Sequence, residues 1–599
     1  MWYDADDNEL DQEPHVRHLR LREMLARIMP LFRPHRAKLA AAALLLLGSV
    51  AAELGGPLIV RRLLDDVIPA GDVNGILVHA LGYALLFAAG MGLAYVQVVM
   101  VWRIGLKIVT GLRQELFAHL LTLSLAYFDR NPPGRLMARV ESDVEKLMML
   151  FSDVALAIFR NFVLFAGTFT VMLIANARVT LAVLALLAPL LAATYFFLKY
   201  IRRVSRTVRR LYARISAFLV EYVQGIPILQ IFGYTEQAQL DLMRLNQDKY
   251  RQELRLYLVE YGFWALFASV EIAAVMIIIF VGARQIFDAA MSVGTLVLFI
   301  EYTRRVFWPL IMFSEQLDFI QRAFASADRV FEVLDTPSRT PDRPDAREEV
   351  PDDWREIAFE RVSFQYEGGV RALEEIDLRI QRGEKIAVVG LSGGGKTTLT
   401  NILLRFYEPS AGRVSIDGVD IREYRQQAWR AKIGLVLQDI HLFPGTLGEN
   451  LKVMRARIPD EDLERALRVV QAQELVARLP GGLDAELAEG GSNLSMGERQ
   501  LVCFARAVVE DPDLLVLDEA TSSVDPVTES RLQRALDALL AGRTSLIVAH
   551  RLATVVSADR ILVMHQGRLV EEGTHAELYR HGGIYRDLFD LQFAAQAAN

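Results

Sequence analysis

Six apolar stretches constrain this chain most, because about 20 such residues are needed for a helix to cross a bilayer. They are Leu39–Val60, Ile76–Trp102, Asp153–Ala175, Val179–Tyr200, Tyr257–Ala283 and Gly294–Met312. The long links after the second and fourth stretches are rich in Arg and Lys. Because basic loops stay on the cytosolic side, both chain ends are expected in the cytosol. The first half therefore predicts a membrane α-helical bundle with six transmembrane helices, whose long links extend the spanning helices into the cytosol.

The residues before the first stretch differ in charge. Residues 1–15 are acidic, which is unlike a signal peptide and indicates a solvated cytosolic tail. Residues 16–38 are basic, with Leu21, Leu25, Ile28 and Phe32 at helical spacing. This pattern predicts an amphipathic helix on the inner membrane face, with an ordinary cytosolic helix as the alternative.

Several ionisable residues lie inside the expected spans. Since charge in hydrocarbon costs a few kcal/mol, such residues usually face a bundle interior or a cavity. Those near helix ends can reach the interface, whereas Glu53, Glu271 and Glu301 are deeper candidates for lining a pathway. The full set is Glu53, Arg160, Glu260, Glu271, Glu301, Arg304 and Arg305.

The second half of the chain has a different composition. Over the whole chain 52% of residues are apolar and 23% charged, which fits a membrane part joined to a soluble part. We expect a transmembrane domain at 39–330, a polar, proline-containing linker at 331–353 and a soluble domain at 354–599. The single Cys503 excludes an intrachain disulfide or a Cys-based zinc site. A net charge of −7 argues against a nucleic-acid partner.

Short buried strands alternate with helical segments in this second half, which predicts an α/β domain of the P-loop type with a largely parallel sheet. The strand Ile386–Val389 leads directly into Gly390-Leu391-Ser392-Gly393-Gly394-Gly395-Lys396-Thr397, a G-x-x-x-x-G-K-[ST] loop. Its backbone N–H groups can surround phosphates, while Lys396 reaches the β- and γ-phosphates and Thr397 binds Mg²⁺. The segment 354–599 is therefore expected to be a nucleotide-binding domain, and the expected nucleotide contacts here are Gly390, Ser392, Gly393, Gly394, Gly395, Lys396, Thr397 and Thr398.

A second site element follows the strand Leu514–Leu517. Asp518 suits a Mg²⁺ ligand, and Glu519 suits the base that polarises an attacking water. These carboxylates are expected to share a site with the phosphate loop.

Just before that strand, Leu494-Ser495-Met496-Gly497-Glu498-Arg499-Gln500 resembles the L-S-G-G-Q-x-Q signature of the ATP-binding cassette (ABC) superfamily. The resemblance implies that Ser495 and Gly497 contact a γ-phosphate held by a partner's loop. It implies that Tyr366 stacks on adenine and that Gln438 bridges Mg²⁺ and water. It also implies that Asp525 lies in a loop crossing the dimer interface, and that His550 holds the γ-phosphate.

The membrane half resembles the exporter-type permease of this family, with Phe128–Leu136 and Glu221–Pro227 similar to its two coupling regions. The resemblance implies a half-transporter that uses ATP and Mg²⁺ and acts as a dimer in the lipid bilayer. Because the sequence shows no organelle presequence, we expect this bilayer to be a bacterial inner membrane. The expected function is export of a hydrophobic or amphipathic compound, with a lipid flippase as the alternative.

Other classes fit less well. A peptide exporter is disfavoured, since the first 38 residues are too few for a peptidase domain. A soluble structural-maintenance or repair ATPase conflicts with the six spans. A nucleotide-gated channel would not need Glu519.

Two signature positions depart from the family pattern. Met496 replaces a glycine and adds bulk, and Glu498 replaces a glutamine and adds negative charge. Both are expected to weaken the half-site that this signature forms. The combination favours a heterodimer with a second half-transporter whose signature is intact and whose catalytic carboxylate is missing. A homodimer with two tolerant sites stays open.

Overall fold

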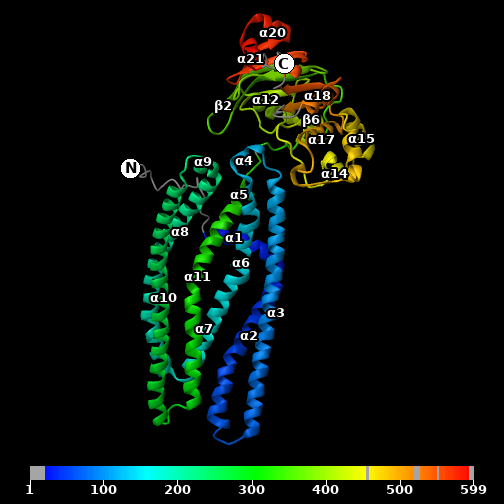
Figure 1. The fold of residues 1–599 in the computed structure, drawn as a ribbon. Helices are drawn as coiled ribbons and strands as arrows, with labels where there is room; N and C mark the ends of the chain where they lie inside the picture. The colour runs from blue at the N-terminus through cyan, green and yellow to red at the C-terminus, as the bar shows by residue number, and fades with distance from the viewer. Residues whose placement is uncertain (1–20, 339, 454–457, 519–525, 550–551, 593–599) are drawn as a thin grey trace. The chain divides into compact units, whose positions relative to one another are not determined.

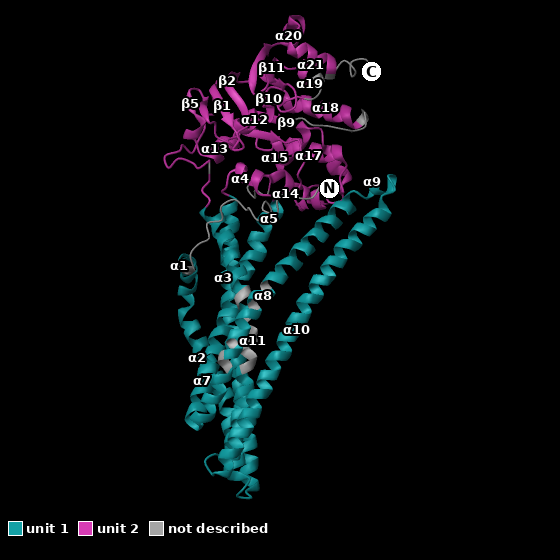
Figure 2. Cartoon of the chain, turned by 90° about the vertical axis from the view of Figure 1, so that its left-hand side faces the viewer, with its two compact units in different colours: residues 1–121, 133–335 teal, residues 122–132, 336–599 magenta. Residues whose placement is uncertain are grey.

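The computed structural model describes residues 21–338, 340–453, 458–518, 526–549 and 552–592. They form two compact units, which Figure 2 colours separately. The first unit holds the chain up to residue 121 together with 133–335, and the second holds 122–132 together with the chain from 336. The expected acidic tail at 1–15 and the start of the helix expected at 16–38 lie outside the described residues.

The first unit consists of helices, several of them long and running side by side (Figure 1). In chain order they are α1 (Leu21–Phe32), η1 (Arg33–His35), α2 (Arg36–Arg62), η2 (Leu63–Val67), α3 (Val73–Leu120), α5 (Pro133–Ala138), η3 (Arg139–Asp143), α6 (Val144–Met149), η4 (Leu150–Val154), α7 (Ala155–Ala175), α8 (Ala177–Gln224), α9 (Ile226–Ile231), α10 (Thr235–Phe287) and α11 (Val293–Asp335).

Within the described residues, four helical stretches are long and apolar enough to cross a membrane: Ala26–Val67, Val73–Leu120, Pro133–Ala175 and Thr235–Phe287. The fourth and sixth stretches of the sequence lie in the long helices α8 and α11. The helices continue beyond the apolar segments: α3 runs on to Leu120 and α8 to Gln224. The structure thus confirms the helical bundle and the helical character of the long links.

A buried ion pair joins η3 to α11. Asp143, only 4% exposed, accepts hydrogen bonds from Arg329 Nε and Nη2, both at 2.8 Å. The hydroxyl of the fully buried Ser326 donates to the same carboxylate at 2.8 Å, and Lys146 Nζ donates at 3.2 Å. Because four donors satisfy one carboxylate, this cluster fixes the π-helical turn η3 against α11.

The second unit contains a six-stranded sheet of order β12-β11-β3-β10-β9-β6, parallel except for β12, and a four-stranded antiparallel sheet of order β2-β1-β4-β5. The strands are β1 (Glu356–Gln365), β2 (Arg371–Gln381), β3 (Lys385–Val389), β4 (Ala411–Ile416), β5 (Val419–Asp420), β6 (Ile433–Val436), β7 (Gly445–Thr446), β8 (Glu486–Leu487), β9 (Leu514–Asp518), β10 (Thr544–Val548), β11 (Arg560–His565) and β12 (Arg568–Gly573).

The helices of this unit surround the sheets. They are α4 (Leu125–Arg130), α12 (Lys396–Leu403), η5 (Ile421–Glu423), α13 (Gln426–Ala431), α14 (Leu447–Lys452), α15 (Asp460–Val469), α16 (Gln473–Arg478), η6 (Gly482–Asp484), η7 (Glu489–Gly491), α17 (Met496–Val508), α18 (Pro526–Leu540), α19 (Leu552–Val556), α20 (His575–His581) and α21 (Ile584–Gln592).

Alternating side chains of the parallel strands fill two cores, one on each face of the sheet. In β3, Ile386 and Val388 pack into the core shared with α12 and the antiparallel sheet, and Ala387 and Val389 into the core shared with α17 and α18. Strands buried on both faces read as continuous apolar runs, which is why the sequence indicated them. The predicted α/β domain with a largely parallel sheet is confirmed.

Candidate functional site

The loop between β3 and α12 depends on its glycines. Gly390 has a φ of +151°, and a Cβ there would lie 2.1 Å from the Met564 carbonyl oxygen. Gly395 has a φ of +99°, and a Cβ there would lie 2.5 Å from the Ala372 carbonyl oxygen. Because backbone atoms cause both clashes, no side chain fits at either position. The chain therefore curls tightly in front of α12, which begins at Lys396.

The ammonium group of Lys396 lies across this loop. The residue is 8% exposed, and its Nζ donates to the carbonyls of Gly390 at 2.8 Å and Leu391 at 3.0 Å. Burial lowers the pKa of Lys396, and the Asp518 carboxylate acts in the opposite direction. A cation hydrogen-bonded to two neutral carbonyls, in a loop that leads into a helix N-terminus, is well placed to exchange them for a phosphate.

A cavity of about 740 Å³ opens in front of the loop, within the size range of ligand sites. It brings together the loop after β3, the first turn of α12, residues that follow β1 and β6, the start of β2, the last residues of β9 and β10, and α21. The predicted residues that line it are Tyr366, Gly390, Ser392, Gly393, Gly394, Gly395, Lys396, Thr397, Thr398, Gln438 and Asp518. Arg371, Leu588 and Leu591 also line it, and the sequence analysis did not predict them.

Tyr366 directly follows β1 and stands at the edge of this cavity. Its hydroxyl lies 3.1 Å from Thr398 Oγ1, and its ring meets the Tyr407 ring edge-on with centroids 5.4 Å apart. These contacts fix a flat apolar surface beside the phosphate loop, as a stacking platform for a base requires.

Three of the predicted site residues, Glu519, Asp525 and His550, lie outside the described residues. Asp518 ends β9, and Val548 ends β10 beside it in parallel register. The roles of Glu519, Asp525 and His550 therefore stay predictions from the sequence.

The signature segment lines no part of this cavity. Ser495 is the N-cap of α17: its Oγ accepts from the Glu498 N–H at 3.3 Å, and Glu498 Oε2 accepts from the Ser495 N–H at 2.9 Å. Gly497 is buried, and a Cβ there would lie 2.3 Å from Thr528 Cγ2. The serine is thus presented at a helix N-terminus, where backbone N–H groups and the helix dipole favour an anion.

Glu498 has an ion-pair partner that the sequence did not indicate. Arg478, the last residue of α16, pairs with its carboxylate. The side chain of Glu498 is 17% exposed, while that of Arg478 is 64% exposed. The acidic substitution in the signature is therefore both part of a helix cap and neutralised. Met496, the first residue of α17, is 43% exposed.

Comparison with known proteins identifies both halves of the chain. Residues 39–310 match the ABC transporter transmembrane region, and residues 373–522 match the ABC transporter family. The ATP-dependent lipid A-core flippase of Nitrosococcus oceani is 33% identical over 571 residues, which cover 95% of each chain. The chain belongs to the ABC transporter family.

Two further comparisons extend this result. The probable multidrug resistance ABC transporter ATP-binding/permease protein YheH of Bacillus subtilis is 34% identical over 489 residues, covering 81% of this chain and 72% of that protein. A solved bacterial Atm1-family ABC exporter with ATP bound superposes with a TM-score of 0.76 at 25% identity, covering 93% of this chain and 99% of the other.

These matches confirm the predicted family, fold and ATPase activity. The protein is a multi-pass membrane ABC exporter half-transporter, and it is an ATP hydrolase coupled to transport. Half-transporters of this family act as dimers within the membrane.

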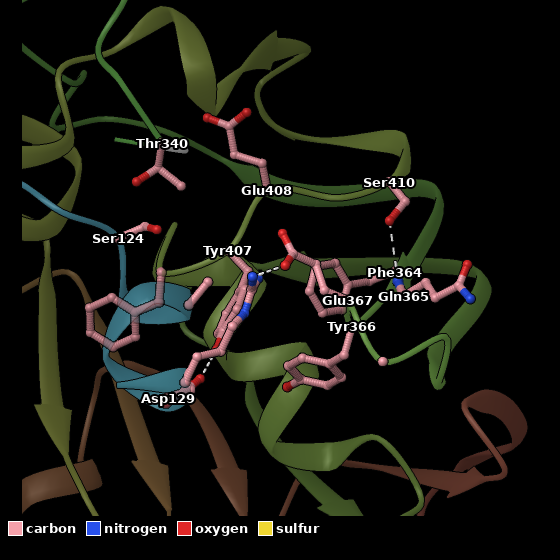
Figure 3. A pocket seen from close by; sticks show the side chains of 14 residues that line it. Ser124, Asp129, Thr340, Phe364, Gln365, Tyr366, Glu367, Tyr407, Glu408 and Ser410 are labelled. Carbon is pink, nitrogen blue, oxygen red and sulfur yellow. Dashed lines mark hydrogen bonds and ion pairs between the residues drawn. The ribbon is translucent and has the colours of Figure 1, made fainter. Parts of the chain in front are cut away.

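The first predicted coupling corner, Phe128–Leu136, begins in α4, and its residues 128–132 belong to the nucleotide-binding unit of this ABC exporter. Tyr407 donates a hydrogen bond to Asp129, and Arg130 forms an ion pair with Glu367. All four residues line a cavity of about 610 Å³, and Figure 3 shows Asp129 directed at the Tyr407 hydroxyl. Burial, and then the hydrogen bond to Asp129, raise the pKa of Tyr407, so its hydroxyl stays a donor.

Proposed function

We propose that this half-transporter uses ATP to export a hydrophobic or amphipathic compound across a bacterial inner membrane, with both termini in the cytosol. The observation that carries the proposal is the nucleotide cavity, in which the phosphate loop, Tyr366, Gln438 and Asp518 meet on the same chain as the membrane helices. The basic links between the spans support the orientation.

Each nucleotide contact has a chemical reason. Loop N–H groups and Lys396 hold the phosphates, and Tyr366 stacks on adenine. Thr397, Gln438 and Asp518 offer hydroxyl, amide and carboxylate oxygens to one cavity, the ligand atoms that Mg²⁺ prefers. When bound, Mg²⁺ neutralises charge on the β- and γ-phosphates.

Hydrolysis is assigned to the residues that follow β9 and β10. Glu519 takes a proton from the attacking water and orients it, and His550 donates a hydrogen bond to the γ-phosphate. Asp525 belongs to the loop that meets the partner cassette.

The dimer explains why the signature lies apart from its own nucleotide cavity. Ser495 and Gly497 would meet the γ-phosphate held by the partner's loop, so ATP closes two cassettes head-to-tail. Closure moves the long cytosolic helices together, and hydrolysis releases them. ATP binding thus shifts the membrane helices between two conformations.

We favour a heterodimer, with a homodimer as the alternative. Met496 carries this preference, because its exposed side chain stands next to Ser495 at the N-terminus that would approach the phosphate. The half-site formed by this signature would then hold ATP without efficient turnover. The partner would supply an intact signature to the loop, Glu519 and His550 of this chain.

ATP hydrolysis by the chain in lipid nanodiscs tests both proposals. A heterodimer predicts weak turnover from the chain alone and full turnover after addition of a half-transporter that lacks the carboxylate. Glu519→Gln should abolish that turnover while ATP binding persists. Robust turnover by the chain alone would overturn the heterodimer, and turnover that survives Glu519→Gln would overturn the assignment of the base.

A lipid flippase is the second candidate, because one full-length relative is a lipid A-core flippase. The two functions differ in what should stimulate ATP hydrolysis. An exporter of soluble amphiphiles responds to the added compound in every bilayer, whereas a flippase responds to the lipid composition of the nanodisc.

A further inference from the structure

A cavity of about 360 Å³ lies among α2, α3, α7 and α11 of the membrane unit. It lies within the first, second, third and sixth apolar stretches. On the α3 side its wall is apolar, with Leu86, Phe87 and Met91. Phe87 is 62% exposed and Met91 60% exposed, so both offer apolar surface to a hydrocarbon tail.

The opposite wall carries charge. Glu53 of α2 accepts a hydrogen bond from Arg160 Nη2 of α7 at 2.8 Å, and this is an ion pair between two membrane helices. Charged side chains in a spanning segment are expensive, and those that occur pair with one another and mark ligand pathways. Three of the predicted in-span ionisable residues, Glu53, Arg160 and Arg305, thus line one cavity.

Arg305 of α11 lines the same cavity, and a proline in α2 explains its contact with Glu53. The Glu53 carbonyl would normally accept from the N–H four residues later, but that residue is Pro57, which has none. Arg305 Nη1 donates to this carbonyl instead, at 2.6 Å. A guanidinium carries five N–H donors, so further donors remain after this bond.

The charge count is two guanidinium groups against one carboxylate. Arg160 is paired with Glu53, and among the described side chains Arg305 has no carboxylate partner. The cavity therefore has a net charge of +1 beside an apolar wall, which favours a ligand with one negative head and a hydrocarbon tail.

We propose that this cavity binds the head of an anionic amphiphile, a carboxylate or a phosphate monoester, with its tail against α3. This deepens the proposed export function and rests on it. Arg305 would hold the head through its remaining N–H groups, and Arg160 would turn from Glu53 toward it.

Equilibrium binding to the full chain in phosphatidylcholine nanodiscs tests this without requiring ATP turnover or transport. The probe is dodecyl phosphate, the matched cation is dodecyltrimethylammonium, and empty nanodiscs give the partition background. The wild type should bind the phosphate at least about tenfold more tightly than the ammonium.

Opposite changes of site charge give the sharpest comparison. Arg160→Gln should weaken dodecyl phosphate binding about tenfold, whereas Glu53→Gln should strengthen it. The Glu53→Gln/Arg160→Gln pair keeps the net charge and should return close to the wild type. The control is Arg178→Gln, which replaces an exposed arginine at the start of α8 and should leave the affinity for both probes unchanged.

A purely structural ion pair predicts a different pattern. Both single variants would then lower the thermal stability, and neither would move the phosphate-to-ammonium ratio. That result, or equal binding of the two probes by the wild type, overturns the proposal. If the wild type binds dodecyl phosphate and dodecyltrimethylammonium equally but still hydrolyses ATP, only this inference is refuted, and the proposed export function stands.

Phosphatidylglycerol in the nanodisc then separates the two sources of an anionic head. Competition with dodecyl phosphate supports the site and assigns it to a bilayer lipid. Binding that phosphatidylglycerol leaves unchanged supports the site and assigns it to a dissolved amphiphile.

Discussion

Replacing Asp143 by asparagine should strongly destabilise the membrane unit. The carboxylate is 4% exposed and takes two bonds from Arg329 and one from Ser326, all at 2.8 Å. Asparagine removes the negative charge that pairs with Arg329 in a buried site, and breaking a buried pair costs about 3–5 kcal/mol in general. The Arg329 side chain is 29% exposed, so water offsets part of this cost, and we expect about 3 kcal/mol.

Thermal unfolding of the chain in nanodiscs measures the effect. With an unfolding entropy of about 2.1 cal/mol/K per residue over the roughly 320 residues of this unit, Asp143→Asn should lower Tm by about 4 °C. The control is Asp241→Asn, which breaks an exposed pair with Arg244 on α10 and should cost less than about 1 kcal/mol. Asp143→Asn/Arg329→Gln removes both charges and should recover part of the loss. Equal shifts for Asp143→Asn and Asp241→Asn, or no recovery in the double variant, would refute the reasoning.

Four further changes probe the nucleotide-binding unit. Arg478→Ala leaves the charge of Glu498 without this ion pair and should raise the KM for ATP about fivefold, measured by phosphate release. Adding Glu498→Gln should return the KM toward the wild-type value. If the effects of the two substitutions on KM simply add, Arg478 does not compensate the charge of Glu498. Lys396→Ala should weaken binding of a fluorescent ATP analogue about 10–100-fold, so unchanged affinity would remove Lys396 from the site. Gly395→Ala places a Cβ 2.5 Å from a carbonyl oxygen and should abolish that binding without unfolding the unit, as circular dichroism would check. Tyr407→Phe removes the bond to Asp129 and should lower substrate-stimulated ATP hydrolysis while ATP affinity stays unchanged; full stimulation would exclude a coupling role for this contact.

The features that the sequence predicted are those determined by residues adjacent in the chain. The run Ile386–Val389 and the glycines after it specify a strand and a tight loop by local sterics alone. Apolar runs of bilayer length likewise specify the membrane helices, since no other element satisfies its backbone in lipid. Tyr366 and Gln438 were predicted from their resemblance to family positions and Asp518 from its place after a buried strand, and all three line one cavity.

The features that the sequence did not predict depend on contacts between distant segments. Arg478 lies 20 residues before Glu498, and nothing in either segment indicates their ion pair. Arg305 reaches the Glu53 carbonyl from α11 only because Pro57 leaves that oxygen without a helical donor. A partner of this kind is fixed by packing geometry, which hydrophobic periodicity does not encode.

The same applies to the edges of the nucleotide-binding unit. Leu588 and Leu591 line the nucleotide cavity from α21, an amphipathic helix whose sequence resembles any surface helix. The sheet of β2, β1, β4 and β5 also went unpredicted, because its strands alternate apolar and polar residues and lack the continuous apolar runs that indicated the parallel strands.

ATP-driven export is tested most directly by uptake into inside-out inner-membrane vesicles from bacteria that express the chain. Vesicles that contain the chain should accumulate a fluorescent amphiphile when ATP is added, and those with Glu519→Gln should not, although both bind ATP. Accumulation that needs no ATP, or that persists in Glu519→Gln, would contradict ATP-driven export by this chain.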